Sequence, residues 1–143
     1  MNYQHIRVVP ASAYVGAEIG GVDLAKPLKD EALGEIRRAF GEYGVVFFRD
    51  QHLSPEQHIA VAERFGPIDI NRFFAHVPGY PIIAEVRKEP EQERNIGGGW
   101  HTDHSYDEVP ALGSMLYARE VPQTAGTRSL PACTPPMTRC PLG

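Results

Sequence analysis

Three kinds of residue are confined to part of this 143-residue sequence. No cysteine occurs before Cys133, so a framework of disulfide bonds is excluded for residues 1–132. No histidine follows His104, and no aspartate or glutamate follows Glu120. These side chains bind metals and transfer protons, so residues 121–143 offer very few groups for such chemistry.

Long apolar runs and charge excess are also missing. No segment approaches the length of a membrane-spanning helix, and the N-terminus lacks the charged-then-apolar pattern of a signal peptide, so we expect a cytoplasmic protein. The net charge of -4 gives no reason to expect nucleic acid or an anionic membrane as a partner. The content of 42% hydrophobic and 22% charged residues is typical of a soluble globular domain.

Two helices are predicted in the first half of the sequence. We expect the first over residues 31–43, with Asp30 as its N-cap and Gly44 at its end. Apolar residues recur at helical spacing on one face, at Leu33, Ile36, Phe40 and Tyr43. The segment Ser54-Pro55-Glu56-Gln57 predicts the start of the second helix, because it combines a serine cap, an early proline and a capping-box glutamine.

Strand signals surround these helices. Strands are expected at residues 6–9, 45–48, 82–86 and 113–119, with a glycine-broken strand over residues 15–24. The continuous apolar segment 45–48 predicts a strand that is buried on both faces. The order, with helices early and strands later, indicates an α+β fold.

The most informative motif is Trp100-His101-Thr102-Asp103, which follows three glycines. Side chains two residues apart on an extended backbone point to the same face, so His101 and Asp103 can bind one metal ion. One imidazole and one carboxylate are two of the three ligands of the 2-His-1-carboxylate triad that binds non-haem Fe(II). A third, distant histidine is expected downstream, and none follows His104. The alternative is a chance polar pair on a surface strand.

Several segments taken together resemble the TauD/TfdA family of Fe(II)- and 2-oxoglutarate-dependent dioxygenases. The matching segments are Tyr14–Ala17, Gly21–Leu24, Val45–Gln51, Ser54–Gln57, Arg64–Pro67, Trp100–Asp103 and Val121–Pro122. The resemblance covers roughly residues 6–126. It implies a double-stranded β-helix (jelly roll) with helices packed outside. Family members are longer, so this chain would hold a partial, truncated form of that fold, with residues 1–126 as the N-terminal part of the dioxygenase domain.

The resemblance also implies a function. It predicts an enzyme that hydroxylates a small organic substrate with O2, with Fe(2+) as cofactor and 2-oxoglutarate as cosubstrate. By position, His101 and Asp103 correspond to the first two iron ligands of the family. The third iron ligand and an arginine that binds 2-oxoglutarate belong to the missing half, so we expect the 143-residue chain to be inactive. The alternative is a non-catalytic, cupin-like fragment that binds a metal or ligand; a homo-oligomer is possible in either case.

Three residues occupy positions where taurine-type members contact their substrate. Asn71 stands where such members have a histidine, Phe74 where they have a tyrosine, and Gly97 where they have a pocket asparagine. The loss of these donors argues against a sulfonate such as taurine, because a buried anion requires charge-assisted partners. Two alternatives are open for Arg72: its side chain supplies the missing donor, or it faces solvent.

Residues 127–143 differ in composition from the rest of the chain. They contain no acidic residue and gather prolines with Cys133 and Cys140. One interpretation is a disordered, proline-rich tail. The other is a shifted reading frame: back-translation with one guanine restored beside codon 126 permits Gly-Gly-Asp-Thr-Leu-Phe-Ala-Ser-Met-Tyr-Ala-Ala-Tyr-Asp-Ala-Leu-Ser-Pro. This string contains the family's Gly-Gly-Asp-Thr-Leu motif, so we predict that a single-base deletion replaced the C-terminal half.

Overall fold

The computed structural model describes residues 2–89, 91–92, 99 and 107–120. The chain divides into two compact units. Of the described residues, unit 1 comprises 2–65 and 118–120, and unit 2 comprises those between 66 and 117. Within the described part of the chain, no helix has the length and apolar character needed to cross a membrane.

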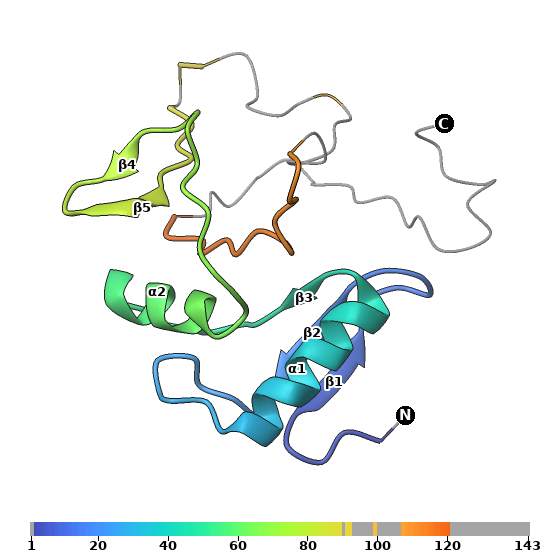
Figure 1. Cartoon of the computed structure of the whole chain (residues 1–143). Helices are drawn as coiled ribbons and strands as arrows, with labels where there is room; N and C mark the ends of the chain where they lie inside the picture. Colours follow the sequence, from blue (N-terminus) through green and yellow to red (C-terminus); the bar gives the residue numbers. More distant parts are fainter. Residues whose placement is uncertain (1, 90, 93–98, 100–106, 121–143) are drawn as a thin grey trace. The chain divides into compact units, whose positions relative to one another are not determined.

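The sheet of unit 1 has three strands in the order β1-β2-β3: β1 (Arg7–Pro10), β2 (Ala17–Gly20) and β3 (Val46–Phe47) (Figure 1). β1 pairs with β2 antiparallel, and β2 pairs with β3 in parallel. The central strand buries its alternate residues Ala17 and Ile19, as expected for a sheet with one covered face. Pro10 is tolerated in β1 because β1 is an edge strand.

Two glycines set the ends of the central strand. Gly16 and Gly21 flank β2, with φ of +88° and +84°. Side chains with a Cβ rarely adopt this left-handed conformation, so glycine permits the chain to turn at each end. Gly16 and Gly21, two of the glycines that predicted a broken strand over residues 15–24, therefore lie just outside the two ends of β2.

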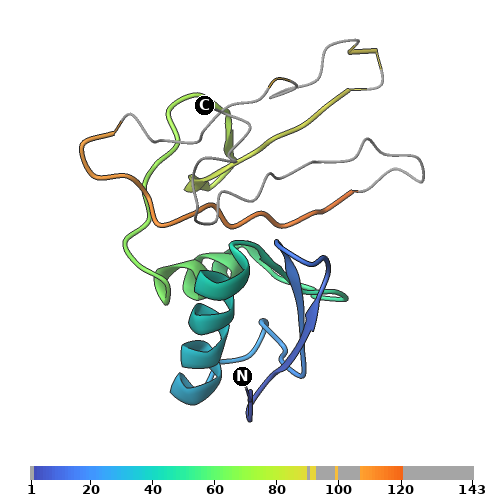
Figure 2. The same cartoon turned by 90° about the vertical axis from the view of Figure 1, so that its right-hand side faces the viewer.

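Helix α1 (Asp30–Tyr43) lies alongside one face of this sheet (Figure 2). It ends at Gly44 as predicted: Gly44 has φ of +69°, and its N–H donates to the Phe40 carbonyl at 2.8 Å. The predicted cap is wrong by one residue, because Lys29 is the N-cap and Asp30 is the first helical residue. The Asp30 carboxylate accepts a hydrogen bond from Arg64.

The core of unit 1 lies between α1 and the sheet. It is formed by Ile6, Ile19, Ala32, Ile36 and Ala39, and it is extended by half-buried neighbours that include Tyr43 and Phe65. Ile36 is the largest side chain there that is fully buried, with 0% exposure. The predicted apolar face is therefore confirmed for Leu33 and Ile36, whereas Phe40 and Tyr43 are only half-buried.

We expect Ile36→Ala to lower the free energy of unfolding by about 2–5 kcal/mol, because it leaves a cavity at a fully buried site. The measurement is urea unfolding followed by far-UV circular dichroism. Gly34→Ala in the same helix is the control. Nothing lies within 4 Å of a Cβ added at Gly34, so this change should stabilise the helix by about 0.5–1 kcal/mol. Equal stabilities for the two variants would contradict the placement of Ile36.

Helix α2 (Pro55–Glu63) begins with the predicted capping box. The Gln57 backbone N–H donates to Ser54 Oγ at 3.2 Å, and the Ser54 backbone N–H donates to Gln57 Oε1 at 2.8 Å. The Gln57 side-chain amide also donates to the Ala25 carbonyl at 3.0 Å. The cap therefore links α2 to the loop that leads into α1.

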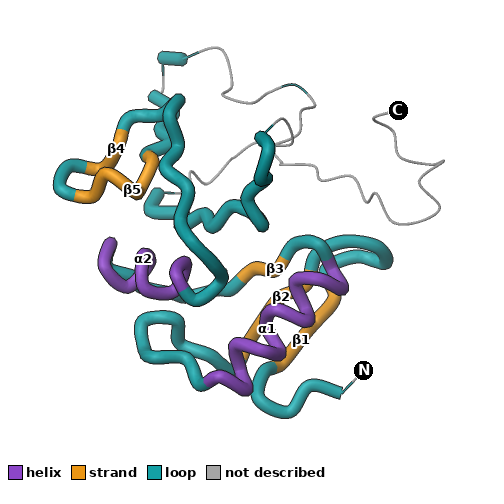
Figure 3. Tube along the Cα trace, viewed as in Figure 1, coloured by secondary structure: helices purple, strands orange, loops and turns teal. Residues whose placement is uncertain are grey.

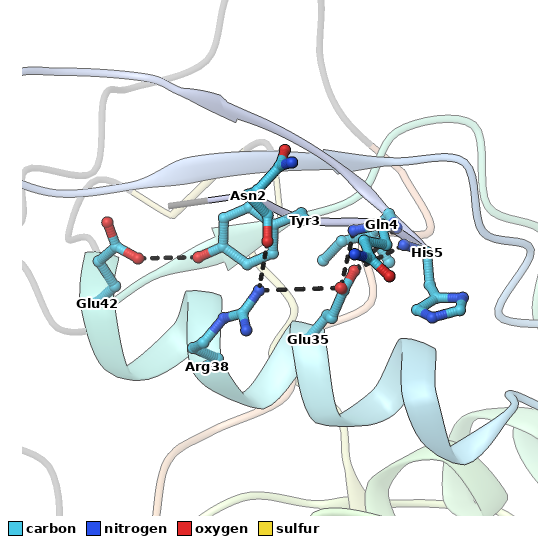
Figure 4. A network of polar contacts seen from close by, with 8 residues as sticks. Asn2, Tyr3, Gln4, His5, Glu35, Arg38 and Glu42 are labelled. Carbon is cyan, nitrogen blue, oxygen red and sulfur yellow. Dashed lines mark hydrogen bonds and ion pairs between the residues drawn. The ribbon is translucent and has the colours of Figure 1, made fainter.

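The N-terminal segment is bound to α1 by a network of polar contacts (Figure 4). The Glu35 carboxylate accepts the backbone N–H groups of residues 4, 5 and 6 at 2.8, 2.8 and 3.2 Å. The Tyr3 hydroxyl donates to Glu42 at 2.9 Å, and the Arg38 guanidinium carbon lies 4.5 Å from the centroid of the Tyr3 ring. This network orders the residues that lead into β1.

These contacts favour the ionised form of Glu35. The N–H of Gln4 is the largest cause that lowers the pKa of Glu35; burial opposes it, and the N–H groups of His5 and Ile6 lower the pKa further. A carboxyl whose pKa is lower in the folded state stabilises the fold fully above its unfolded pKa. That contribution is lost as the pH falls through the folded pKa.

We therefore expect Glu35→Gln to lower the melting temperature at neutral pH, and the gap to the unmodified chain to narrow on acidification. Thermal scans at pH about 7 and about 3 measure both effects. The control is Glu31→Gln, since Glu31 is exposed on the same helix. A gap that stays constant between the two pH values would show that the Glu35 charge does not anchor the N-terminal segment.

Unit 2 contains a hairpin of β4 (His76–Val77) and β5 (Tyr80–Ala84), drawn as two short strands in Figure 3. His76 is opposite Ala84 in the register. Gly79 forms the turn with φ of +81°. β5 begins two residues before the strand predicted at residues 82–86.

Two strand predictions are wrong. Residues 113–119 form no strand and lie in an irregular, largely exposed segment, with Leu116 at 71% exposure. The segment predicted to be buried on both faces contributes only the two-residue β3, which is half-buried because it lies at the edge of its sheet. The α+β class is supported by the two helices and two small sheets, and the described residues form no closed barrel.

Candidate functional site

The predicted iron ligands His101 and Asp103 lie outside the described residues, as does Gly97. Their roles therefore stay predictions. Among the residues that the structure describes, no group of three or more histidine, cysteine, aspartate or glutamate side chains is placed to hold a metal ion.

Asn71 and Phe74, the other predicted substrate residues, belong to one tight turn in unit 2. The Asn71 side-chain oxygen Oδ1 accepts two backbone N–H groups, from Phe73 at 2.8 Å and from Phe74 at 3.2 Å. This is the turn that asparagine forms when its side chain replaces a backbone carbonyl. The turn brings Asn71 and Phe74 together, and their predicted contact with substrate stays a prediction.

His76 joins this turn to the hairpin. Its ring nitrogen Nε2 lies 3.0 Å from the carbonyl oxygen of Asn71. A carbonyl only accepts, so Nε2 is the protonated nitrogen in this contact. The backbone of His76 is held in turn by β4, which pairs with β5, and by the hydrogen bond from the Glu85 N–H to the Ala75 carbonyl at 2.8 Å.

The turn fixes the chemistry that Asn71 can offer. Its Oδ1 is already shared by two N–H groups, so the side chain is left with the NH2 group, which only donates. Phe74 is half-buried, whereas Phe73 is 74% exposed and Arg72 is also exposed. The turn thus contains one side-chain amide, two phenylalanine rings and one arginine.

No pattern in the sequence predicts the contact of His76 with the Asn71 carbonyl. A histidine five residues after an asparagine follows no rule of local spacing. The one available signal is that Asn71 favours a turn, which shortens the distance to the residues that follow it.

Two hollows in unit 1 lie beside the loop before α1, with volumes of about 280 and 340 Å³. Lys26, Pro27 and Leu28 line both of them. Neither hollow is lined by a residue predicted to bind iron or substrate. We therefore assign no site to them.

The comparisons with known proteins give a consistent picture. The sequence profile described as "Taurine catabolism dioxygenase TauD, TfdA family" matches residues 7–130. The chain is 35% identical over 124 residues to the (S)-phenoxypropionate/alpha-ketoglutarate-dioxygenase of Sphingobium herbicidovorans, covering 83% of this chain and 42% of that protein. It is 29% identical to the alpha-ketoglutarate-dependent sulfonate dioxygenase of Saccharomyces cerevisiae, covering 87% of this chain and 33% of that protein.

A solved structure supports the same likeness. A putative alpha-ketoglutarate-dependent taurine dioxygenase from Burkholderia xenovorans superposes with a TM-score of 0.51 at 47% sequence identity. The superposition covers 53% of this chain and 28% of that structure. The chain spans less than half the length of these curated relatives.

Proposed function

Because the chain belongs to the TauD, TfdA family of dioxygenases, we propose that it carries the N-terminal part of an enzyme that hydroxylates a small organic substrate with Fe(II), 2-oxoglutarate and O2. The observation that carries this proposal is the family match over residues 7–130, which includes His101 and Asp103 in their glycine-led segment. Both curated relatives compared above are named as alpha-ketoglutarate-dependent dioxygenases.

The donor set of the predicted site suits ferrous iron. An imidazole nitrogen from His101 and a carboxylate oxygen from Asp103 are the mixed N and O ligands of non-haem iron oxygenases. When bound, Fe(II) would allow O2 to act as the oxidant: two electrons come from the C–H bond that is hydroxylated and two from 2-oxoglutarate, which is converted to succinate and CO2. The protein's part is to fix the two ligands on one face of the backbone and to place the substrate beside them.

The turn at residues 71–74 is the part of the described structure to which we assign substrate placement. The donor-only amide of Asn71 suits an acceptor such as a carboxylate oxygen, and the ring of Phe74 suits an apolar substrate body. A small organic acid satisfies both requirements. Taurine is disfavoured, since Asn71 and Phe74 stand where taurine-type members have the histidine and tyrosine that contact their substrate.

We propose that the two small sheets are part of a double-stranded β-helix that the whole enzyme completes. Two observations support this assignment. The superposed taurine-dioxygenase structure is more than three times as long as the matched region, since only 28% of it is covered. Val109, Leu112 and Leu116 are exposed at 86%, 68% and 71%, as expected for apolar residues whose neighbouring strands are not among the described residues.

Residues 127–143 are proposed to be the product of a single-base deletion rather than a functional tail. The support is that restoring one guanine beside codon 126 recreates a Gly-Gly-Asp-Thr-Leu motif from a segment without acidic residues. Resequencing the DNA over codons 124–128 tests the idea. The absence of an open frame downstream after the base is restored would contradict it.

The enzyme proposal is tested by iron-dependent formation of succinate from 2-oxoglutarate. One feature favours a second candidate, a cupin-like module that binds a metal or ligand without catalysis: the sequence holds only two of the three expected iron ligands. A binding module would take up metal but would form no succinate, with either the present or the restored reading frame. Succinate formation by the restored product would exclude it.

A further inference from the structure

We propose that the loop between β2 and α1 is a latch for α2. This loop, residues 22–28 (the strap), runs beside α2 (Figure 1). Three side chains from α2 and the residues next to it bind the strap: Gln51, Gln57 and Arg64. Release of these contacts frees α2 as one unit while the core between α1 and the sheet stays folded. The released segment ends at Phe65, where the chain passes into unit 2.

Gln51 holds the first part of the strap. Its Oε1 accepts the backbone N–H of Leu24 at 2.8 Å, and its Nε2 donates to the Val22 carbonyl at 3.4 Å. One carboxamide therefore serves a backbone donor and a backbone acceptor at the same time. The partners are 27 and 29 residues apart in the sequence, so these bonds form only when unit 1 is folded.

α2 holds the rest of the strap from both of its ends. Gln57 Nε2, in the first turn, donates to the Ala25 carbonyl at 3.0 Å. Arg64 Nη1, at the C-cap, donates to the Leu28 carbonyl at 3.1 Å. Both bonds run from a side chain to a backbone carbonyl. A substitution in α2 therefore removes one of them without changing the sequence of the strap.

Apolar packing adds little to these polar contacts. α2 buries one residue, Val61, whereas α1 buries four. The hollow of about 340 Å³ lies between the strap and α2, so the apolar contact between these two segments is incomplete. Segments with few buried apolar contacts open at a lower free energy than the core, so α2 should open before α1. The half-buried Phe65 packs against the core and marks the end of the segment that opens.

The first test is amide hydrogen exchange of the unmodified 143-residue chain, measured by NMR at increasing urea concentrations. After correction for intrinsic rates, we expect Val61 and Ala62 in α2 to exchange at least about tenfold faster than Ile36 and Ala39 in α1. Their exchange should also depend less on urea, because a local opening exposes less surface than global unfolding. Equal rates and equal urea dependence in the two helices would overturn the proposal.

The second test uses Gln57→Glu, which separates the latch from the helix. Glutamate keeps the acceptor oxygen of the capping box but has no amide to donate to the Ala25 carbonyl. We expect α2 amides to exchange about threefold to tenfold faster in this variant, with α1 amides changed by less than about twofold. Glu63→Gln, at an exposed position of α2, is the control. Unchanged exchange in α2, or an equal acceleration in α1, would overturn the proposal.

Gln51→Glu repeats the test from outside α2. It keeps the acceptor for the Leu24 N–H but loses the donor to the Val22 carbonyl. Because residue 51 is not part of α2, faster exchange of the α2 amides reports the strap rather than the helix itself. We expect an acceleration of about threefold, and an unchanged rate would count against the latch. If a variant fails to fold, the comparison of the two helices in the unmodified chain still decides the proposal.

Discussion

The 143-residue chain is expected to release no CO2 from 2-oxoglutarate above background, whereas the product of the gene with one guanine restored beside codon 126 releases it in an iron-dependent reaction. The reason lies in the ligand count. His101 and Asp103 offer two ligands, and the sequence contains no histidine after His104 to complete the set. The difference should exceed about 100-fold, because even the outer partners of metal ligands are worth about 10–100-fold in activity.

The measurement is capture of CO2 from carboxyl-labelled 2-oxoglutarate, with and without added Fe(II), for both proteins at equal concentration. Omission of iron from the restored protein is the internal control. Circular dichroism checks that the short chain keeps its helices, since unit 1 has its own core of Ile6, Ile19 and Ile36. Iron-dependent turnover by the 143-residue chain would show that two ligands suffice and would remove the argument from ligand count.

The features that the sequence predicted well are those determined by neighbouring residues. The capping box at Ser54 and Gln57 and the helix end at Gly44 formed as expected. Each depends on hydrogen bonds within a few residues, and serine, glutamine and glycine have specific local roles. The glycines at 16 and 21 belong to the same class, because their left-handed backbone needs no distant partner.

The predictions that failed depend on distant residues. Asp30 is the first helical residue rather than the cap, and its carboxylate accepts a hydrogen bond from Arg64, 34 residues further along the chain. Residues 113–119 have the composition of a strand, but a strand requires a neighbouring strand to pair with, and no strand of the described residues pairs with this segment. The burial of β3 likewise follows from its edge position, which composition does not reveal.

The same distinction between neighbouring and distant residues applies to the candidate site. The His101-x-Asp103 pair could be proposed from sequence because two ligands at fixed spacing on an extended segment need no tertiary information. The contact of His76 with the Asn71 carbonyl could not be predicted, because it depends on the Asn71 turn and on the β4–β5 pairing together. Sequence therefore suggested the metal pair, and the structure supplied the contact between His76 and the Asn71 turn.

In the restored enzyme, His101→Ala and Asp103→Ala should each abolish iron-dependent succinate formation, with a loss greater than about 100-fold. Each substitution removes one of the three protein ligands expected of the site, so iron binding should weaken along with activity. Asp103→Asn is the sharper variant. It keeps the shape of the side chain and one oxygen but removes the negative charge that balances the cation, so it tests charge separately from size.

Iron content after dialysis and succinate formation are measured for each variant. Circular dichroism is recorded as well, because it would reveal a change in folding. His104→Ala is the matched control: on an extended backbone its side chain points to the face opposite His101 and Asp103, so its effect should stay below about tenfold. If His104→Ala abolishes iron binding while Asp103→Ala does not, the ligand pair has been misassigned. If both His101→Ala and Asp103→Ala retain iron and activity, the facial-triad interpretation of this segment is wrong, because no other histidine and carboxylate in the chain share its glycine-led setting.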